Sequence, residues 1–369
     1  MRTRIAAFAA IVQLILLAGH GLVYATWVTL WGAPAGVRLT ALRIVLAVLA
    51  MSFVPATLLA HRYFNGPVRL IYRLASIWLG VFNFLFVAAF LCWITYSVVF
   101  LLKLPVGGHA IADTFFGLAI LASLYGIVNA ADIRVRRVTV KLPGLPASWR
   151  GRVAALVTDT HLGHIKGYHF LTRVVGMLRQ LKADVVFISG DLFDGTKVDA
   201  RRLVAPWKQL RPRFGSYFVT GNHEEFTDPR KYLEAIEGSG IRVLRNEKVN
   251  LDGLQVVGVP YSEAGNAKNL QSVLEKAELD RQRASVLLTH VPQGLPIAEK
   301  QGISLQLSGH THGGQIWPFT WFTWRIFGDY TYGLKKFGEL LVYTSSGAGT
   351  WGPPMRVCTV PEIVLICFE

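Results

Sequence analysis

Cysteine and charged residues are scarce in this sequence of 369 residues, a length that allows roughly two domains. Three cysteines are too few for a disulfide scaffold. Only 17% of the residues are charged, against 52% that are hydrophobic, and this apolar content excludes an intrinsically disordered chain. Acidic residues are the scarcer charged kind, 23 against 38 basic ones, which gives a net charge of +15. Soluble domains rarely combine these features, so the composition indicates a membrane protein with a soluble part.

The scarcity of charge is confined to the first third of the chain. Residues 1–132 hold eight basic and two acidic side chains, whereas residues 133–369 hold thirty and twenty-one. Four apolar runs lie in the first part, at about 5–30, 39–60, 74–102 and 111–131. Each exceeds the ~18 apolar residues that mark a membrane-spanning helix. We therefore predict an N-terminal four-helix transmembrane bundle over residues 1–132, a linker over 133–149 and a second domain over 150–369.

Two features of the runs bear on the predicted topology. The third run, about 29 residues long, could tilt strongly or conceal a re-entrant stretch, which would change the number of crossings. We do not expect the first run to be a cleavable signal peptide, because it is too long and three more apolar runs follow it. We expect His20, a polar residue in this run, to satisfy an interhelical hydrogen bond rather than to mark a transport path.

The basic residues in the loops predict the orientation, because Lys and Arg stay on the cytoplasmic side of a membrane. Nine of them precede the first run, separate the second from the third, or follow the fourth: Arg2, Arg4, Arg62, Arg69, Arg73, Arg134, Arg136, Arg137 and Lys141. The opposite loops hold only three: Arg38, Arg43 and Lys103. We therefore predict a multi-pass protein of the cell inner membrane, with its second domain in the cytoplasm.

The second part alternates short β-type runs with helical stretches, which is the pattern of an α/β domain. The predicted strands are residues 153–158, 185–189, 217–220, 255–259, 286–289 and 305–308. The predicted helices are residues 168–181, 229–236 and 268–278, where apolar residues recur at intervals of three and four.

Polar side chains of the kinds that bind metal ions follow five of these strands. The clusters are Thr158-Asp159-Thr160-His161, Ser189-Gly190-Asp191, Thr220-Gly221-Asn222-His223-Glu224, Thr289-His290 and Gly309-His310-Thr311-His312. Ligands of open α/β sheets bind at the carboxyl ends of strands, so we expect the five clusters to converge on one rim.

The chemistry of the clusters indicates a metal site without sulfur. Carboxylates, an amide and imidazoles suit Mn, Fe, Zn or Co ions. Asp159 and His161 are two residues apart on a segment that we expect to be extended, so both can point to one side and hold one ion. His310 and His312 have the same spacing, which suggests two ions. Asp191 is the central candidate for a carboxylate that bridges ions about 3.5–4 Å apart.

Each of these residues also has a less specific interpretation. A lone histidine is most often a satisfied polar residue, and an aspartate after a strand often caps a helix. Five of the ten histidines nevertheless fall in the clusters. We expect His164 and His169, which lack such a setting, to lie on the surface. Glycines in three of the clusters would let the backbone approach the ions closely: Gly190, Gly221 and Gly309.

The order D-x-H, G-D, G-N-H-E, T-H and G-H-T-H resembles the calcineurin-like metallophosphoesterase superfamily over most of residues 150–369. The stretch from Ser308 to Ile316 and the tail from Ser346 to Pro354 are similar to the membrane-associated bacterial branch. The resemblance implies a four-layer α/β/β/α sandwich and hydrolysis of a phosphate ester or anhydride. None of the five motifs departs from the superfamily pattern, so the resemblance implies an active enzyme.

The resemblance also implies roles for individual residues. Two divalent or trivalent metal ions (Mn, Fe, Zn or similar) would share Asp191. The first ion would be held by Asp159, His161, Asp191 and His312, and the second by Asp191, Asn222, His290 and His310. His223 would donate a proton or stabilise charge near the leaving group, and Glu224 would orient its imidazole. For Asp194 two interpretations stay open, an acceptor behind the ligands or a turn residue.

The substrate is less well defined by the sequence. The aromatic stretch from Ile316 to Trp324, with Arg325, Lys335 and Lys336 nearby, could form an apolar lip for an amphiphilic phosphate at the bilayer surface, or could pack in the core or between the two domains. Some members of the superfamily hydrolyse UDP-2,3-diacylglucosamine in lipid A synthesis, which suggests a nucleotide-linked lipid. The expected partners are the lipid bilayer and a phosphorylated small molecule; nucleic acid is not expected, and the oligomeric state stays open.

Two alternatives to this function stay open. One is a nuclease or cyclic-nucleotide phosphodiesterase, which the same metal core can serve; the basic residues are scattered, however, rather than gathered into a nucleic-acid footprint. The other is a non-catalytic membrane sensor or scaffold with a structural metal site, for which the pair His223 and Glu224 would be unnecessary.

Overall fold

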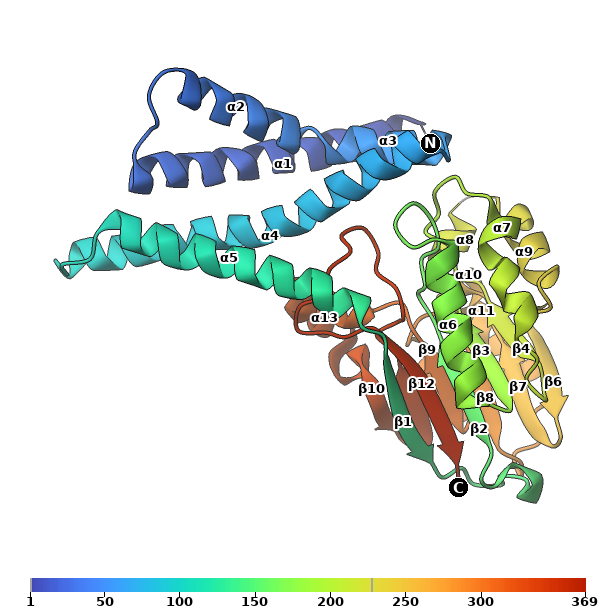
Figure 1. Ribbon diagram of the computed structural model, residues 1–369. Helices are drawn as coiled ribbons and strands as arrows, with labels where there is room; N and C mark the ends of the chain where they lie inside the picture. Colours follow the sequence, from blue (N-terminus) through green and yellow to red (C-terminus); the bar gives the residue numbers. More distant parts are fainter. Residues whose placement is uncertain (1, 227) are drawn as a thin grey trace. The chain divides into compact units, whose positions relative to one another are not determined.

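The computed structural model describes residues 2–226 and 228–369. The side chains of residues 2–5 lie outside the described residues, and with them Arg2 and Arg4, which contribute to the predicted orientation. The chain divides into two compact units (Figure 1). One comprises Met1–Val128 with Gly352–Met355, and the other comprises Asn129–Trp351 with Arg356–Glu369.

The first unit is helical. Its helices are α1 (Arg2–Trp31), α2 (Val37–Ala50), α3 (Phe53–Arg62), α4 (Gly66–Leu101) and α5 (Gly108–Ala131), the last of which continues into the second unit. Among the described residues, four segments are long and apolar enough to cross a membrane, as expected: Ala6–Trp31, Val37–Arg62, Gly66–Leu101 and Gly108–Asn129.

The second and third segments differ from simple spans in opposite ways. The second is interrupted between α2 and α3, because Pro55 has no amide hydrogen for the carbonyl of Met51. The third is one unbroken helix of 36 residues, so it contains no re-entrant stretch. Such a helix is about 54 Å long, which exceeds a hydrocarbon core of about 30 Å. If α4 spans the membrane, it must therefore tilt strongly or extend beyond the hydrocarbon core of the bilayer.

Hydrogen bonds join α1 to α4 within this unit. The Trp78 indole donates to Nε2 of His20 over 2.9 Å, and the Trp93 indole donates to Oγ1 of Thr26 over 2.9 Å. The expectation that His20 satisfies an interhelical hydrogen bond is thus confirmed.

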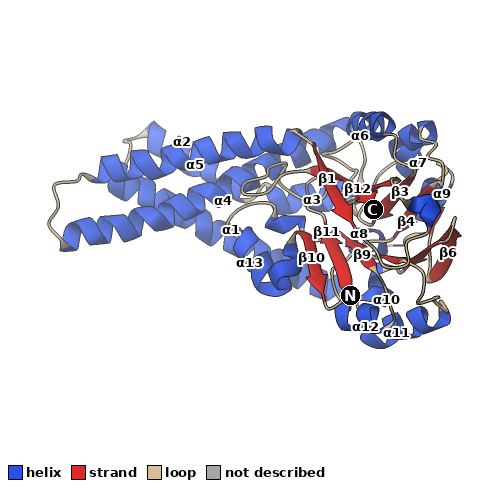
Figure 2. Cartoon of the chain, turned by 90° about the horizontal axis from the view of Figure 1, so that it is seen from below, coloured by secondary structure: helices blue, strands red, loops and turns tan. Residues whose placement is uncertain are grey.

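The second unit contains two six-stranded sheets (Figure 2). The first has the order β1-β12-β2-β3-β4-β5, with β1 (Arg134–Val140), β12 (Glu362–Phe368), β2 (Val153–Val157), β3 (Val185–Ser189), β4 (Ser216–Val219) and β5 (Arg242–Val243). The second has the order β10-β11-β9-β8-β7-β6, with β10 (Gly333–Phe337), β11 (Leu340–Thr344), β9 (Leu305–Ser308), β8 (Ser285–Leu288), β7 (Leu254–Gly258) and β6 (Glu247–Leu251). Both sheets are mixed, since β12 is antiparallel to β2, and β6 and β10 are antiparallel to their neighbours.

Helices cover the outer faces of the two sheets (Figure 1). Those beside the first sheet are α6 (Tyr168–Leu181), α7 (Ala200–Val204) and α9 (Arg230–Glu237), and those beside the second are α10 (Tyr261–Ala264), α11 (Ala267–Lys276) and α12 (Leu295–Lys300). The main core lies between the sheets, where Leu156 and Phe187 of the first meet Val256 and Val286 of the second. The α/β/β/α sandwich is therefore as expected.

One predicted segment differs from the structure. Residues 134–140, expected to belong to a linker, form β1, an edge strand that pairs in parallel with β12. Its sequence Arg-Val-Arg-Arg-Val-Thr-Val is largely exposed. Basic residues are common on edge strands because they discourage pairing with other chains, so their presence does not exclude a strand.

Candidate metal centre

The polar clusters meet where strands of both sheets end. Asp159 and His161 follow β2, Asp191 follows β3, and Asn222 and His223 begin the short helix α8 (Asn222–Glu225) after β4. From the second sheet, His290 follows β8, and His310 and His312 follow β9. The core between the sheets holds these ends close together, and the expected convergence on one rim is observed.

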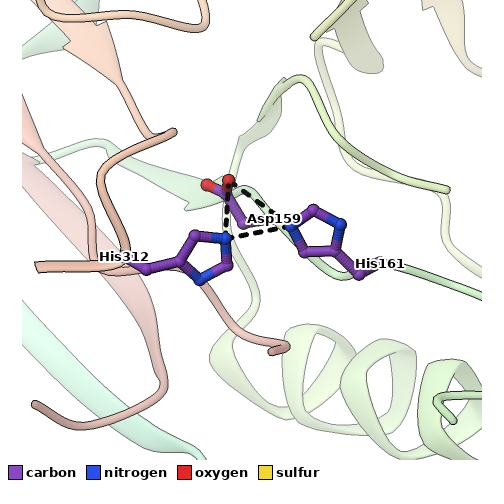
Figure 3. A group of neighbouring side chains, drawn as sticks. All are labelled: Asp159, His161 and His312. Carbon is purple, nitrogen blue, oxygen red and sulfur yellow. Dashed lines mark hydrogen bonds and ion pairs between the residues drawn. The ribbon is translucent and has the colours of Figure 1, made fainter. Parts of the chain in front are cut away.

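The first group of donor atoms joins Asp159, His161 and His312 (Figure 3). Nε2 of His161 lies 2.9 Å from Nε2 of His312. Oδ1 of Asp159 lies 3.4 Å from Nε2 of His312 and 3.8 Å from Nε2 of His161. All three side chains point toward one another and are almost completely removed from solvent.

The second group surrounds Asn222 and joins Asp191, His290 and His310. Oδ1 of Asn222 lies 3.1 Å from Nε2 of His290 and 2.9 Å from Nδ1 of His310. Oδ2 of Asp191 lies 3.1 Å from Nε2 of His290 and also 3.9 Å from Nε2 of His161 in the first group. Asp191 is therefore the residue that connects the two groups.

The spacing and type of these atoms fit metal ions. Ligand atoms about 2.0–2.2 Å from one ion lie about 3.0–3.5 Å from each other, which is close to the distances above. His290 donates from Nδ1 to the carbonyl of Ser189 over 2.7 Å, so in the neutral ring Nε2 is the nitrogen with a lone pair, directed at Asp191 and Asn222. A shared cation in place of the proton on Nε2 would satisfy these buried acceptor atoms, and the residues present thus fit a metal centre.

The backbone at the donor residues adopts a conformation that the sequence analysis did not anticipate. We expected an extended segment at Asp159 and His161, but their φ angles are 52° and 47°. Asp191, His310 and His312 have φ angles of 50°, 71° and 50°. Left-handed conformations of non-glycine residues cost about 1–3 kcal/mol each and cluster at functional sites. These sharp turns, rather than strand alternation, direct the side chains inward.

All three predicted glycines allow the close approach that the centre needs, and a Cβ atom at Gly221 would clash with the carboxylate of Asp191. A Cβ atom at Gly190 would lie 2.6 Å from Nδ1 of His290, and its φ of 79° also favours glycine. A Cβ atom at Gly309 would clash with Thr158 and with the carboxylate of Asp159. Larger residues at any of the three positions would displace a donor.

The ionisation of the second group reflects burial and mutual charge. Burial alone would raise the pKa of Asp191, but the charge and hydrogen bond of His290 hold it well below its usual range. Burial likewise opposes a charge on His290, yet Asp191 outweighs it and raises the pKa of His290 to about 10. Burial, followed by the charge of His290, lowers the pKa of His310 to about 4.

The histidines of the first group are held neutral. Burial and then the neighbouring His223 lower the pKa of His161 well below its usual value. Burial and then the positive charge of Arg356 do the same for His312. Neutral imidazoles are the form that binds metal ions.

Glu224 and His223 are arranged differently from the expectation that one orients the other. The Glu224 carboxylate accepts hydrogen bonds from the backbone N–H groups of Asp191, Phe193 and Gly221 over 2.9–3.0 Å. Burial and then the charge of Asp191 raise the pKa of Glu224 to about 8. Its contacts show that it fixes the turn that carries Asp191.

The His223 imidazole is held by a backbone carbonyl instead. Its Nδ1 lies 3.0 Å from the carbonyl oxygen of Asp194, and its Nε2 lies 4.0 Å from Oδ2 of Asp191. The rings of Phe226 and Trp351, both exposed, lie 5.5 and 5.7 Å from the His223 ring. His223 is therefore buried beside the centre and lies close to two exposed aromatic rings.

The structure corrects or completes the expectations for three residues behind the centre. His164, expected on the surface, is buried and contacts Oγ1 of Thr196 over 3.0 Å, whereas His169 is exposed as expected. The Asp194 carboxylate accepts hydrogen bonds within its own turn, from Thr196, which agrees with the interpretation as a turn residue, and its backbone carbonyl accepts from His223 rather than from a predicted ligand. Burial raises the pKa of its carboxyl group.

Arg356 is a residue that the sequence analysis missed. It is fully buried, and its guanidinium donates to the carbonyls of Ser346, Gly349 and His312 over 2.6–3.2 Å. The loop that it holds supports Asp159, whose carbonyl accepts from the Gly349 amide over 2.9 Å. Burial lowers the pKa of Arg356 to about 10. The signal in the sequence was a single arginine between Met355 and Val357, directly after a tail motif.

Comparison with known proteins agrees with this geometry. Residues 153–314 match the family model for the calcineurin-like phosphoesterases. The chain therefore carries a calcineurin-like metallophosphoesterase domain, preceded by helices that can span a membrane.

Its relatives include membrane proteins. A transmembrane protein with metallophosphoesterase domain from Danio rerio is 34% identical over 284 residues, which cover 72% of this chain and 64% of that protein. An uncharacterized metallophosphoesterase of Campylobacter jejuni is 31% identical and covers 66% of each chain. The Bacillus subtilis metallophosphoesterase YkuE is 27% identical over 63% of this chain and 84% of its own. The chain thus spans slightly less than two thirds of the length of the first two relatives.

Proposed function

We propose that this protein is a membrane-anchored phosphoesterase that holds two metal ions and hydrolyses a phosphodiester, phosphomonoester or pyrophosphate bond. The observation that carries the proposal is the position of Asp191, whose Oδ2 atom faces His290 at 3.1 Å and His161 at 3.9 Å. One carboxylate between two donor groups is the arrangement that holds two ions a few ångströms apart. Nitrogen and oxygen donors suit Mn, Fe or Zn.

The residues of the two groups would hold the ions. The first would be held by Asp159, His161, Asp191 and His312, and the second by Asp191, Asn222, His290 and His310. When bound, the ions would supply positive charge to the phosphate oxygens and lower the pKa of water. The chain keeps these donors in place through Glu224, which fixes the Asp191 turn, and Arg356, which supports the loop behind Asp159.

His223 is the residue that we propose as the acid. Its Nδ1–H group donates to the Asp194 carbonyl, which leaves Nε2 as the nitrogen that faces Asp191 and the centre. As the oxygen of a hydroxide, formed from water that has already lost a proton to solvent, forms its bond to phosphorus, the bond from phosphorus to the leaving oxygen breaks, and the proton on Nε2 passes to that oxygen. The leaving oxygen therefore departs as a hydroxyl group rather than as an oxyanion.

The surroundings of His223 support a leaving group with a planar or apolar part. Phe226 and Trp351 flank the imidazole and are exposed, so they can stack on a base or contact an acyl chain. We propose a nucleotide-linked lipid such as UDP-2,3-diacylglucosamine, a lipid A precursor. The excess of basic residues in three of the loops supports an inner-membrane location with the catalytic domain on the cytoplasmic face.

The activity is tested on the purified full-length protein in detergent. Hydrolysis of bis(4-nitrophenyl) phosphate is measured with Mn²⁺, after chelation, and after return of the ion. We expect activity that chelation abolishes and Mn²⁺ restores. His290→Ala should remove it, whereas His169→Ala, at an exposed histidine outside both groups, should not. Activity that survives chelation, or that is never detected, would favour a sensor or scaffold.

The substrate and the orientation need separate measurements. UDP-2,3-diacylglucosamine is compared with single-stranded DNA and a cyclic nucleotide; faster turnover of either of the latter would favour the nuclease or cyclic-nucleotide reading. For the orientation, the exposed Cys358 is labelled with an impermeant maleimide. Labelling only in inverted membrane vesicles would agree with a cytoplasmic domain, and labelling in intact spheroplasts would contradict it.

A further inference from the structure

Helix α13 (Phe319–Phe327) follows the turn that carries His310 and His312 and presents an apolar surface to its surroundings. Each of its residues is exposed or half-buried. Six large apolar side chains, between 42% and 72% exposed, lie in or next to it: Trp317, Phe319, Trp321, Phe322, Trp324 and Ile326. Of the interpretations given for this stretch, packing in the core is therefore wrong for these six side chains and holds for Ile316, which is buried.

The polarity of α13 is the reverse of that expected for a helix of a soluble domain. The half-buried residues are Thr320, Thr323 and Phe327, spaced by three and four, so they share one face. Two of these three are threonines, while the aromatic residues between them face outward. A helix in water normally buries its apolar face and exposes its polar one.

Contacts through Gly328 and Thr331, directly after α13, and through Phe327 at its end join the helix to the turn that carries the two histidines. Oγ1 of Thr311, between His310 and His312, donates to the carbonyl of Thr331 over 2.7 Å, and Oγ1 of Thr331 donates to the carbonyl of Gly328 over 2.7 Å. The ring of Phe327 lies 6.0 Å from the ring of His310. The helix is thus fixed to the turn that supplies donors to both groups.

The features of the chain favour a bilayer as the surface that covers α13. Tryptophan and other aromatic side chains concentrate at the boundary between headgroups and acyl chains, and short helices with such a face lie in that boundary. The fourth candidate span ends at Asn129, the residue with which the second unit begins, so the unit starts at the end of that span. The exposed Arg325 and Lys335 complement anionic headgroups.

We propose that α13 inserts its aromatic face into the membrane interface and thereby holds the metal centre against a phosphate ester carried by a membrane amphiphile. The first part, the insertion, stands on the surface of α13 alone. The second part, the substrate class, rests on the proposed phosphoesterase activity.

Insertion is tested with full-length protein in vesicles of equal parts phosphatidylethanolamine and phosphatidylglycerol. A nitrobenzoxadiazole dye is attached at Ile326→Cys in a background with Cys358→Ser and Cys367→Ser, where the remaining Cys92 is buried. A matched sample carries the dye at Lys276→Cys, an exposed position at the end of α11. We expect lipids with a spin label near the headgroup to quench the dye at position 326 at least about twofold more than at position 276. Equal quenching at both positions would overturn the proposal.

The substrate class is tested with two esters that share a leaving group. Methyl 4-nitrophenyl phosphate is soluble, and hexadecyl 4-nitrophenyl phosphate resides in the vesicle. We expect the combined variant Trp321→Ser, Phe322→Ser and Trp324→Ser to raise KM about tenfold or more for the hexadecyl ester and to leave the methyl ester within about twofold. Leucine at the same three positions should restore the hexadecyl KM, because it keeps the surface apolar.

The outcomes separate this inference from the proposed function. If the wild-type protein hydrolyses neither ester, the phosphoesterase proposal fails, while quenching at position 326 would still support insertion. If the serine variant impairs both esters equally, α13 acts as a structural support of the metal centre and the proposed substrate class is overturned.

Discussion

Replacing Arg356 by methionine should weaken one donor group of the metal centre more than the other. The arginine is fully buried and holds the loop of Ser346 and Gly349 through their carbonyls. That loop supports Asp159 in two ways. The Gly349 amide donates a hydrogen bond to the Asp159 carbonyl, and the backbone of Gly347 packs so closely against Asp159 that an added Cβ atom would lie 2.6 Å from the Asp159 Cβ. Asp191 and the rest of the second group are held by other elements.

The magnitude follows from the hydrogen bonds that are lost. Methionine has a similar length but leaves the carbonyls of Ser346, Gly349 and His312 without this donor, at about 1–3 kcal/mol for each buried group that stays unpaired. Part of this loss of stability is offset, because the variant no longer buries the charged guanidinium group, and burial of a charge costs several kcal/mol. We expect a net loss of about 2–4 kcal/mol, or a fall in Tm of about 5–15 °C for a domain of this size.

The assay is a Mn²⁺ titration of the metal-free protein together with a thermal melt. One of two binding steps should weaken at least about tenfold, since 1.4 kcal/mol corresponds to that factor, and the other should change little. Arg230→Met serves as the control, because Arg230 bonds Asp228 as closely but on the surface; such pairs contribute about 0–1 kcal/mol. Equal weakening of both steps, or an unchanged protein, would refute the reasoning.

Three further predictions concern the acid, the coupling to pH and the Asp191 turn. His223→Ala should leave Mn²⁺ affinity unchanged and slow an ester with an alkoxide leaving group by about 10²–10⁴, but a 4-nitrophenyl ester much less, as steady-state kinetics would show. Because Asp191 raises the pKa of His290 to about 10 in the metal-free protein, His290 carries a proton below that pH. Metal binding at pH 8 should therefore release it, and calorimetry in buffers of different ionisation enthalpy should detect about one proton from this residue; no release would contradict the assigned pairing. Gly190→Ala should lower Mn²⁺ affinity, since the added methyl group meets His290, and an unchanged titration would show that the turn can adapt.

The positions of the metal-type residues could be predicted from the sequence because their local context is unusual. Asp159, Asp191 and His290 each follow a short apolar run, and parallel strands place such positions at one edge of a sheet. These residues do converge in the structure, and their roles as ligands stay predictions. The four apolar segments could also be predicted from the sequence, because length and composition are sufficient to identify them.

The way in which the backbone presents these residues could not be predicted. The left-handed conformations of Asp159, His161 and Asp191 occur at single non-glycine positions. Such conformations cost energy locally and exist only because the surrounding fold imposes them. A spacing of two residues is compatible with either an extended or a turned segment, so the spacing alone does not predict the turn that the structure shows.

The partners behind the donors were hidden by sequence separation. Glu224 bonds the amide of Asp191 across 33 residues, and Arg356 bonds the carbonyl of His312 across 44. The adjacency of His223 and Glu224 in the sequence suggested that one orients the other. In α8, however, His223 contacts the Asp194 carbonyl, whereas Glu224 accepts from backbone amides such as that of Gly221. The strand β1 was missed for a related reason, since its pairing with β12 joins segments more than two hundred residues apart.

The central claim is that Asp191 is shared by two metal ions, and the metal content of Asp191→Asn tests it most directly. Purified full-length protein, loaded with Mn²⁺ and freed of excess ion, is analysed by plasma mass spectrometry alongside its turnover of bis(4-nitrophenyl) phosphate. The account predicts about two ions per chain in the wild type, as in two-metal hydrolases, and loss of metal and turnover together in the variant. A variant that keeps both the ions and the activity would contradict it.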